Sequence, residues 1–110
     1  MANPERPETP DDGGRQTVLE RQPKTKKPKL YRVLFHNDDY TTMEFVEWVL
    51  QVVFHKSDAE SRHLMLAIHH KGFGVAGVFT RDVAESKAQQ ALDLADEHGM
   101  PLQVTTEPDE

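Results

Sequence analysis

The sequence contains no cysteine, which excludes disulfide bonds and thiolate metal sites. It also has no run near the roughly 20 apolar residues of a membrane span, so no transmembrane helix is expected. Residues 1–14 are polar and proline-rich, a composition that does not predict a secretory signal. The net charge of −6 argues against nucleic acid as the main partner. Together these absences favour a protein of the reducing cytoplasm.

The composition of the chain changes near residue 29. Residues 1–29 hold five of the seven prolines and carry a net charge of +2, whereas residues 30–110 carry −8. The first segment has too few apolar residues to offset the entropy lost on ordering, which predicts a disordered tail. Its lysine cluster, residues 24–29, contains no aromatic residue, so a solvated linker is favoured over a nucleic-acid patch. Residues 30–110 are expected to form one compact domain.

The apolar pattern of residues 30–110 predicts the order β-α-α-β-α-β. Strands are expected over residues 30–36, 74–79 and 102–106, where β-branched and aromatic residues gather or alternate with polar ones. Gly77 is expected to mark a bulge or a close backbone approach within the second strand. Three strands and three helices predict an α+β fold, a two-layer sandwich in which a three-stranded antiparallel sheet packs against three helices.

Local signals place the ends of the three helices. Thr41-x-x-Glu44 and Ser57-x-x-Glu60 are capping-box patterns, which predict a first helix over residues 42–54 and a second that begins after Ser57. Gly72 is expected to end the second helix, and Gly99 followed by Pro101 the third. Either Thr80 or Asp82 caps the third helix, which carries an alanine face suited to close packing: Ala84, Ala88, Ala91 and Ala95.

The segment Asn37-Asp38-Asp39-Tyr40-Thr41 lies between the first strand and the first helix. Three side chains with carbonyl or carboxylate oxygens therefore gather beside a helix N-terminus. Such a group can cap the helix, bind a metal ion, or bind a cation such as an ammonium.

Two apolar helical stripes could complete a binding site beside this turn. The first helix presents Met43, Val46 and Leu50, and the second presents Met65, Ile68 and His69. Taken alone, stripes of this kind are typical of a hydrophobic core. If the two helices pack side by side, however, both methionines and the histidine converge on the turn, and methionine suits pockets that accept differently shaped apolar groups. The combination predicts a site for a large apolar side chain next to an ammonium.

Metal binding and catalysis are less well supported by the sequence. Asp38, Asp39 and His69 offer few ligands for a hard cation, and His69 and His70 point about 100° apart on a helix. No two histidines have the spacing of a helical metal motif. There is no nucleophile elbow, glycine-rich phosphate loop or Ser/His/Asp order. We therefore expect a non-enzymatic protein without metal or cofactor.

Several blocks of the sequence resemble the signature of ClpS, the bacterial adaptor family of the ATP-dependent Clp protease. The resemblance extends over about residues 30–107. The matching blocks are Leu30-Tyr31-Arg32-Val33-Leu34, Asn37 to Val46, Leu64 to His69, Gly77-Val78-Phe79-Thr80, Ala84-Glu85-Ser86-Lys87 and Pro101-Leu102-Gln103.

This resemblance implies a fold like that of the C-terminal domain of the ribosomal stalk protein. It also implies binding of N-degron proteins whose first residue is Leu, Phe, Tyr or Trp, and their delivery to the ClpAP unfoldase–protease in the cytoplasm. The implied partners are the N-terminal domain of a ClpA-type AAA+ unfoldase and the N-terminal segments of substrate proteins. We expect a monomer with no cofactor, and residues 1–29 as the segment that the unfoldase engages.

Residue by residue, the resemblance assigns three groups of side chains. The α-amino group of the substrate would contact Asn37, Asp38, Asp39 and His69. The first side chain of the substrate would enter a pocket formed by Thr41, Met43, Val46, Met65, Ile68 and Leu102. The unfoldase would contact Asp82 and Lys87.

The chain departs from the family pattern at a few positions. Thr42 stands where proline is usual, Ser86 replaces a threonine, Asp82 replaces a glutamate, and His36 precedes the turn where an apolar residue is common. Proline at a first helical position pre-organises the helix start, so Thr42 bears on the preference among first residues. The alternative function is a general protein-interaction module on the same fold, in which the Asn-Asp-Asp turn serves only as a cap.

Overall fold

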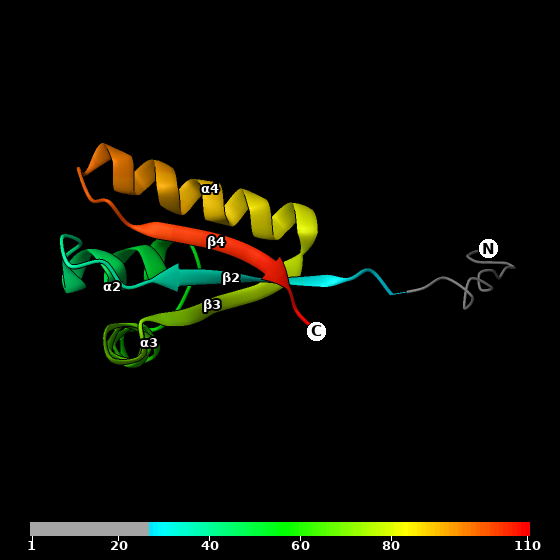
Figure 1. Cartoon of the computed structure of the whole chain (residues 1–110), viewed down its shortest axis with the longest axis horizontal. Coiled ribbons are helices and arrows are strands. Elements are labelled where there is room, and N and C mark those ends of the chain that lie inside the picture. The colour runs from blue at the N-terminus through cyan, green and yellow to red at the C-terminus, as the bar shows by residue number, and fades with distance from the viewer. Residues whose placement is uncertain (1–26) are drawn as a thin grey trace, which may run out of the picture.

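The computed structural model describes residues 27–110, so the tail predicted for residues 1–29 lies outside the described residues except for its last three. The described chain follows the expected order β-α-α-β-α-β (Figure 1). The strands are β2 (Leu30–His36), β3 (Phe73–Thr80) and β4 (Gln103–Pro108). The helices are α2 (Met43–Val52), α3 (Asp58–Lys71) and α4 (Arg81–Glu97).

The sheet has the strand order β3-β2-β4, and both pairings are antiparallel. The register of β2 against β3 shifts after Val33, which pairs with Gly77, while Leu34 pairs with Val75. A Cβ atom on Gly77 would come within 2.5 Å of the Phe79 ring, so any other residue would force that ring to move. The irregularity and the close approach predicted at Gly77 are therefore both confirmed.

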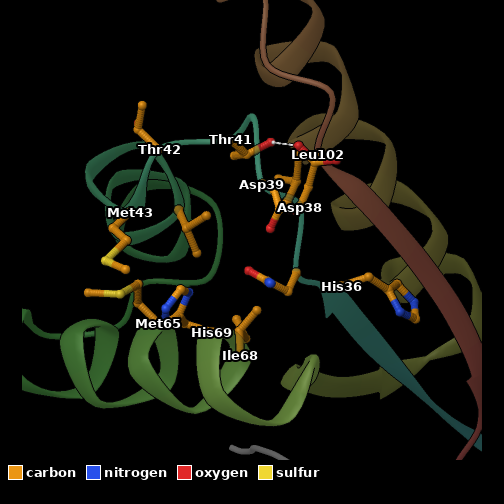
Figure 2. Close-up of a pocket in the computed structure, with 12 residues that line it drawn as sticks. His36, Asp38, Asp39, Thr41, Thr42, Met43, Met65, Ile68, His69 and Leu102 are labelled. Carbon is orange, nitrogen blue, oxygen red and sulfur yellow. Dashed lines mark hydrogen bonds between the residues drawn. The ribbon is translucent and has the colours of Figure 1, made fainter.

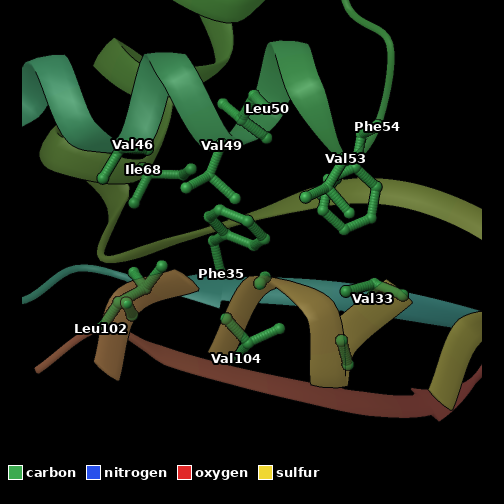
Figure 3. Packing of buried hydrophobic residues seen from close by; sticks show 14 of the residues in the cluster. Val33, Phe35, Val46, Val49, Leu50, Val53, Phe54, Ile68, Leu102 and Val104 are labelled. Carbon is green, nitrogen blue, oxygen red and sulfur yellow. The ribbon is translucent and has the colours of Figure 1, made fainter. Parts of the chain in front are cut away.

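One hydrophobic cluster joins the sheet to all three helices, as Figure 3 shows around Phe35. Val33 and Phe35 of β2 are fully buried in this cluster. The alternate β2 residues Arg32 and His36 instead contact polar side chains of β4. The alanine face predicted for α4 is buried in the cluster, and the expected two-layer α+β architecture is confirmed.

The helix ends follow most of the local signals. Ser57 and Glu60 form the predicted capping box. Gly72 ends α3 with a left-handed backbone, at a φ of 95°. Thr80 precedes α4 as its N-cap, although its side chain makes no capping hydrogen bond.

The cap predicted for the first helix is wrong by one residue. Thr42 is the N-cap of α2, and its hydroxyl oxygen accepts a hydrogen bond from the backbone N–H of Phe45. The Thr41 hydroxyl instead donates to Oδ2 of Asp38 within the turn before the helix. The helix also ends at Val52 rather than Phe54, and His55 then takes a left-handed conformation with a φ of 58°.

Candidate functional site

The strand-to-helix turn after β2 is held by its own side chains and by α3. Oδ2 of Asp38 accepts hydrogen bonds from the backbone N–H of Tyr40 at 2.9 Å and from the Thr41 hydroxyl at 3.0 Å. The backbone N–H of Asn37 donates to the carbonyl of Gly72 at 2.9 Å, just beyond the last turn of α3. The turn is thereby fixed next to the end of the helix that carries His69.

These contacts shape a pocket of about 270 Å³. Met43 extends from α2 and Met65 from α3, and the two side chains face each other across the opening in Figure 2. Ile68 and His69 point from α3 toward the turn, and Leu102 reaches the site from the segment before β4.

All ten residues predicted for substrate binding line this one pocket. The structure therefore brings together the rim residues Asn37, Asp38, Asp39 and His69 and the wall residues Thr41, Met43, Val46, Met65, Ile68 and Leu102. Leu50, the third member of the first helical stripe, is instead fully buried in the core.

Two further residues line the pocket that the sequence analysis did not assign to it, His36 and Thr42. Their positions in the sequence, directly next to assigned residues, could have indicated that they line the pocket. The His36 ring turns away from the opening toward β4, where Nε2 lies 2.7 Å from the Thr105 hydroxyl (Figure 2). His36 thus joins β2 to β4 at the pocket edge, whereas exposed Thr42 contributes the helix cap.

The rim and the wall of the pocket differ in chemistry. Val46, Met65, Ile68 and Leu102 are almost fully buried, while Asn37, Asp39 and His69 are exposed. Among residues 27–110, the Asp39 carboxylate and the Asn37 side chain make no hydrogen bond or ion pair. The site therefore offers unpaired acceptors next to an apolar cavity, which suits a ligand that is cationic at one end and apolar at the other.

The structure gives no support to a metal site at the turn. Within the described part of the chain, no three histidine, aspartate or glutamate side chains are placed to hold one ion. In the same residues no helix has the length and apolar character needed to cross a membrane.

The two residues expected to face an unfoldase lie on α4. Asp82 is exposed in the first turn of the helix. Lys87 is half-buried, and its ammonium donates to the carbonyl of Val53 at 2.8 Å and lies over the rings of Phe54 and Phe79. Lys87 thus also joins α4 to the end of α2.

The fold and this pocket define a small protein of the α+β class, with one pocket that combines a polar rim and an apolar wall. Residues 26–105 match the model of the family described as ATP-dependent Clp protease adaptor protein ClpS. The chain belongs to this family, whose members are adaptors of the Clp protease and not enzymes.

Individual relatives agree with this assignment. The chain is 52% identical to the Clp protease adapter protein ClpS of Deinococcus radiodurans over 103 residues, which is 94% of this chain and 90% of the relative. It is 55% identical to the ClpS of Myxococcus xanthus over 87 residues, covering 79% of this chain and 81% of that protein.

A solved structure of a relative has the same fold. It is Agrobacterium tumefaciens ClpS2 bound to L-phenylalaninamide, and its sequence is 49% identical to this chain. The superposition has a TM-score of 0.73 and covers 76% of this chain and all of the Agrobacterium chain.

Proposed function

We propose that this chain binds proteins whose first residue is Leu, Phe, Tyr or Trp and delivers them to a ClpAP unfoldase–protease in the cytoplasm. The observation that carries the proposal is the single pocket in which unpaired polar acceptors border a buried apolar wall. An N-terminal residue of this kind presents both matching features, an α-ammonium and a large apolar side chain, on one carbon atom.

The rim residues Asn37, Asp38, Asp39 and His69 would bind the α-amino group and the adjoining backbone. Burying an ammonium costs several kcal/mol unless it is paired and hydrogen-bonded, so its acceptors have to be in place beforehand. Asp38 holds the turn through its Oδ2 atom, whereas the Asp39 carboxylate and the Asn37 side chain have no competing contact among the described residues.

The wall residues Thr41, Met43, Val46, Met65, Ile68 and Leu102 would enclose the first side chain. Pockets for drug-sized molecules usually measure about 300–1,000 Å³, and the volume of about 270 Å³ found here suits one residue. The ligand of the Agrobacterium relative supports this proposal, because L-phenylalaninamide carries a free α-amino group beside a benzyl group.

The delivery step would use a different part of the molecule, around the start of α4. Pro28 and Lys29 line a shallow hollow together with Tyr31, Arg81 and Asp82. The segment that leads into residues 30–110 therefore lies beside the face proposed for the unfoldase N-terminal domain, at Asp82 and Lys87. We propose residues 30–110 as the binding unit and residues 1–29 as the segment that the docked unfoldase engages.

Peptide binding with a free and a blocked N-terminus tests the recognition step. A peptide that begins with Leu should bind, whereas the same peptide with an acetylated N-terminus or with Ser in first place should bind at least about tenfold more weakly, because charge-assisted contacts or apolar burial are lost. Equal affinity for the free and acetylated peptides would favour the general interaction module instead.

A shortened chain that begins at Lys27 tests the delivery step. It should bind the Leu-initiated peptide and the unfoldase N-terminal domain normally, yet fail to stimulate degradation of an N-degron substrate. Full-rate degradation would show that tethering at high effective concentration is sufficient.

A further inference from the structure

A second hollow lies between α2 and α4, away from the pocket. It has a volume of about 460 Å³, and none of its residues lines the pocket: Trp48, Val52, Val53, Gln90, Asp93 and Leu94. We call this hollow the α2–α4 groove. Nothing in the proposed recognition of N-terminal residues uses it.

The apolar residues of α2 extend around most of the helix, which is the pattern of a helix covered on all sides. Four of them are buried in the core, namely Phe45, Val46, Val49 and Leu50. The other three are exposed: Met43 by 42%, Trp48 by 39% and Val52 by 45%. The exposure of Met43 is explained by the pocket that it lines, whereas Trp48 and Val52 both line the groove.

Trp48 is held in position by neighbouring rings. Its ring centroid lies 5.2 Å from that of His98 and 5.9 Å from that of Phe45. Tryptophan is among the residues that most often dominate binding energy at protein interfaces. A half-exposed tryptophan that is already immobilised loses little side-chain entropy when a partner covers it.

The charges around the groove are mainly acidic. Asp93 lines it, and helical spacing places Glu97 one turn beyond Asp93 and Glu44 one turn before Trp48. Neither α2 nor α4 has a basic residue in its last turn. Lys87 lies at the Val53 end, and its ammonium already bonds to the Val53 carbonyl.

We propose that the α2–α4 groove binds an amphipathic helix of a partner protein, with the apolar face of that helix on Trp48 and Val52 and basic residues along its flanks. A helix fits because the groove runs between two helices, the arrangement in which ridges of side chains on a third helix can interdigitate. A second copy of this chain fits poorly, because two acidic faces would repel each other.

The test uses the full chain and a synthetic peptide of about 18 residues, roughly five helical turns. The peptide contains leucines at helical spacing on one face and lysines elsewhere, and its acetylated N-terminus keeps it out of the amine site. A scrambled peptide of the same composition is the control. Trp48 is the only tryptophan, so its fluorescence reports on the groove directly. Saturable binding with a shift of Trp48 emission is expected for the amphipathic peptide only.

Variants distinguish binding in the groove from a general attraction of the basic peptide to the acidic protein. Val52→Lys should weaken binding of the amphipathic peptide at least about tenfold, in the range of interface hot spots. Leu66→Lys is the matched control, because Leu66 is also 41% exposed but lies on α3 outside the groove. Trp48→Lys should weaken binding as Val52→Lys does. Because this variant has lost the reporter tryptophan, its binding is measured by the fluorescence anisotropy of a labelled peptide. Unchanged binding of the Leu-initiated peptide shows that each variant is folded.

Three results would overturn the proposal. The first is equal affinity for the amphipathic and scrambled peptides, and the second is equal loss of affinity in Val52→Lys and Leu66→Lys. The third is concentration-dependent dimerisation of the wild-type chain that disappears in Val52→Lys, since a second copy would then be the occupant.

Discussion

The pocket and the α2–α4 groove differ in how their polar groups are arranged. In the pocket, the acceptors are concentrated on one turn and on His69, beside an apolar wall that is mostly buried. In the groove, one carboxylate, that of Asp93, lies among apolar side chains drawn from two helices. The first arrangement suits a single residue with a positive charge at a fixed point, whereas the second suits an extended surface. One short helix, α2, contributes side chains to both hollows through different faces.

The largest effect on affinity is expected when an amine acceptor is removed from the rim. Asp39→Ala or His69→Ala should weaken binding of a Leu-initiated peptide at least about tenfold, because each change removes an acceptor for the charge-assisted hydrogen bonds of the ammonium. Binding of the basic amphipathic peptide to the groove should not change. Isothermal titration calorimetry measures both affinities, with Asp96→Ala on α4 as a control for net charge. A folded double variant with wild-type affinity would rule out capture of the amine.

A smaller effect is expected from adding a side-chain carbon that presses on a residue of the pocket wall. In Gly74→Ala, the new Cβ atom would lie 2.7 Å from Cγ1 of Ile68 and 3.1 Å from Cδ1 of Leu64. Overpacking of this kind costs about 1–3 kcal/mol, and it should also displace Ile68 in the pocket. Chemical denaturation and peptide titration measure the two effects.

A double variant checks that the damage at Gly74 comes from this contact. Gly74→Ala combined with Ile68→Ala should destabilise the protein by less than the sum of the two single changes, because the colliding atom is absent. If the destabilisation of the double variant equals the sum of the two single changes, the strain does not come from the contact between the new Cβ atom at position 74 and Ile68. The groove should bind its peptide normally in every one of these variants that remains folded.

A more selective change concerns the opening of the pocket. Met43→Ala should admit peptides that begin with Ile or Val, because Met43 is expected to narrow the pocket where a branched Cβ would pass. A steric clash of this kind costs roughly 1–3 kcal/mol, so its relief should lower the preference for Leu over Ile by about tenfold or more. Competition binding of Leu and Ile peptides measures this ratio. An unchanged ratio would move the narrow point to Thr42 or Val46.

The smallest effect is expected at a site that belongs to neither hollow. The pKa of Glu60 lies below its ordinary value of 4.5, chiefly because the backbone N–H of Ser57 donates a hydrogen bond to its carboxylate, with a further contribution from the Ser57 side chain beside it. The ionised carboxylate therefore stabilises the fold above pH 4.5, and this contribution is lost as the pH falls through the lowered folded-state pKa.

Glu60→Gln should accordingly reduce the stability difference between neutral and acidic pH without altering either binding site. Thermal melts from pH 7 down to a pH below both pKa values measure the difference, since the stabilisation vanishes there. An identical pH profile in wild type and variant would show that the capping box contributes nothing through its charge.

Much of the fold could be predicted from local signals in the sequence. The strand Leu30–His36, the cap at Ser57 and Glu60, and the left-handed Gly72 match their predictions, because each depends on neighbouring residues only. The N-cap of α2 could not be predicted in the same way. Thr41 and Thr42 are equally good caps by residue type, and only the structure shows that Thr42 accepts from Phe45 while Thr41 donates to Asp38 in the turn.

The candidate pocket was predictable because the resemblance to ClpS supplied its members, and the structure brings all of them around one cavity. The groove was not predictable. In the sequence, Trp48 and Val52 read as further apolar residues of a helix, and only the position of α4 shows that no neighbouring side chain buries them.

The sequence by itself determined the periodicities, the caps and the polar turn, because these follow from side-chain type and spacing over a few residues. Only the tertiary structure decided which apolar residues of α2 enter the core, the pocket or the groove. That choice depends on packing between segments far apart in the chain, such as Leu102 against the pocket and Leu94 beside the groove. The hydrophobic effect is not directional, so it drives burial without specifying the partner.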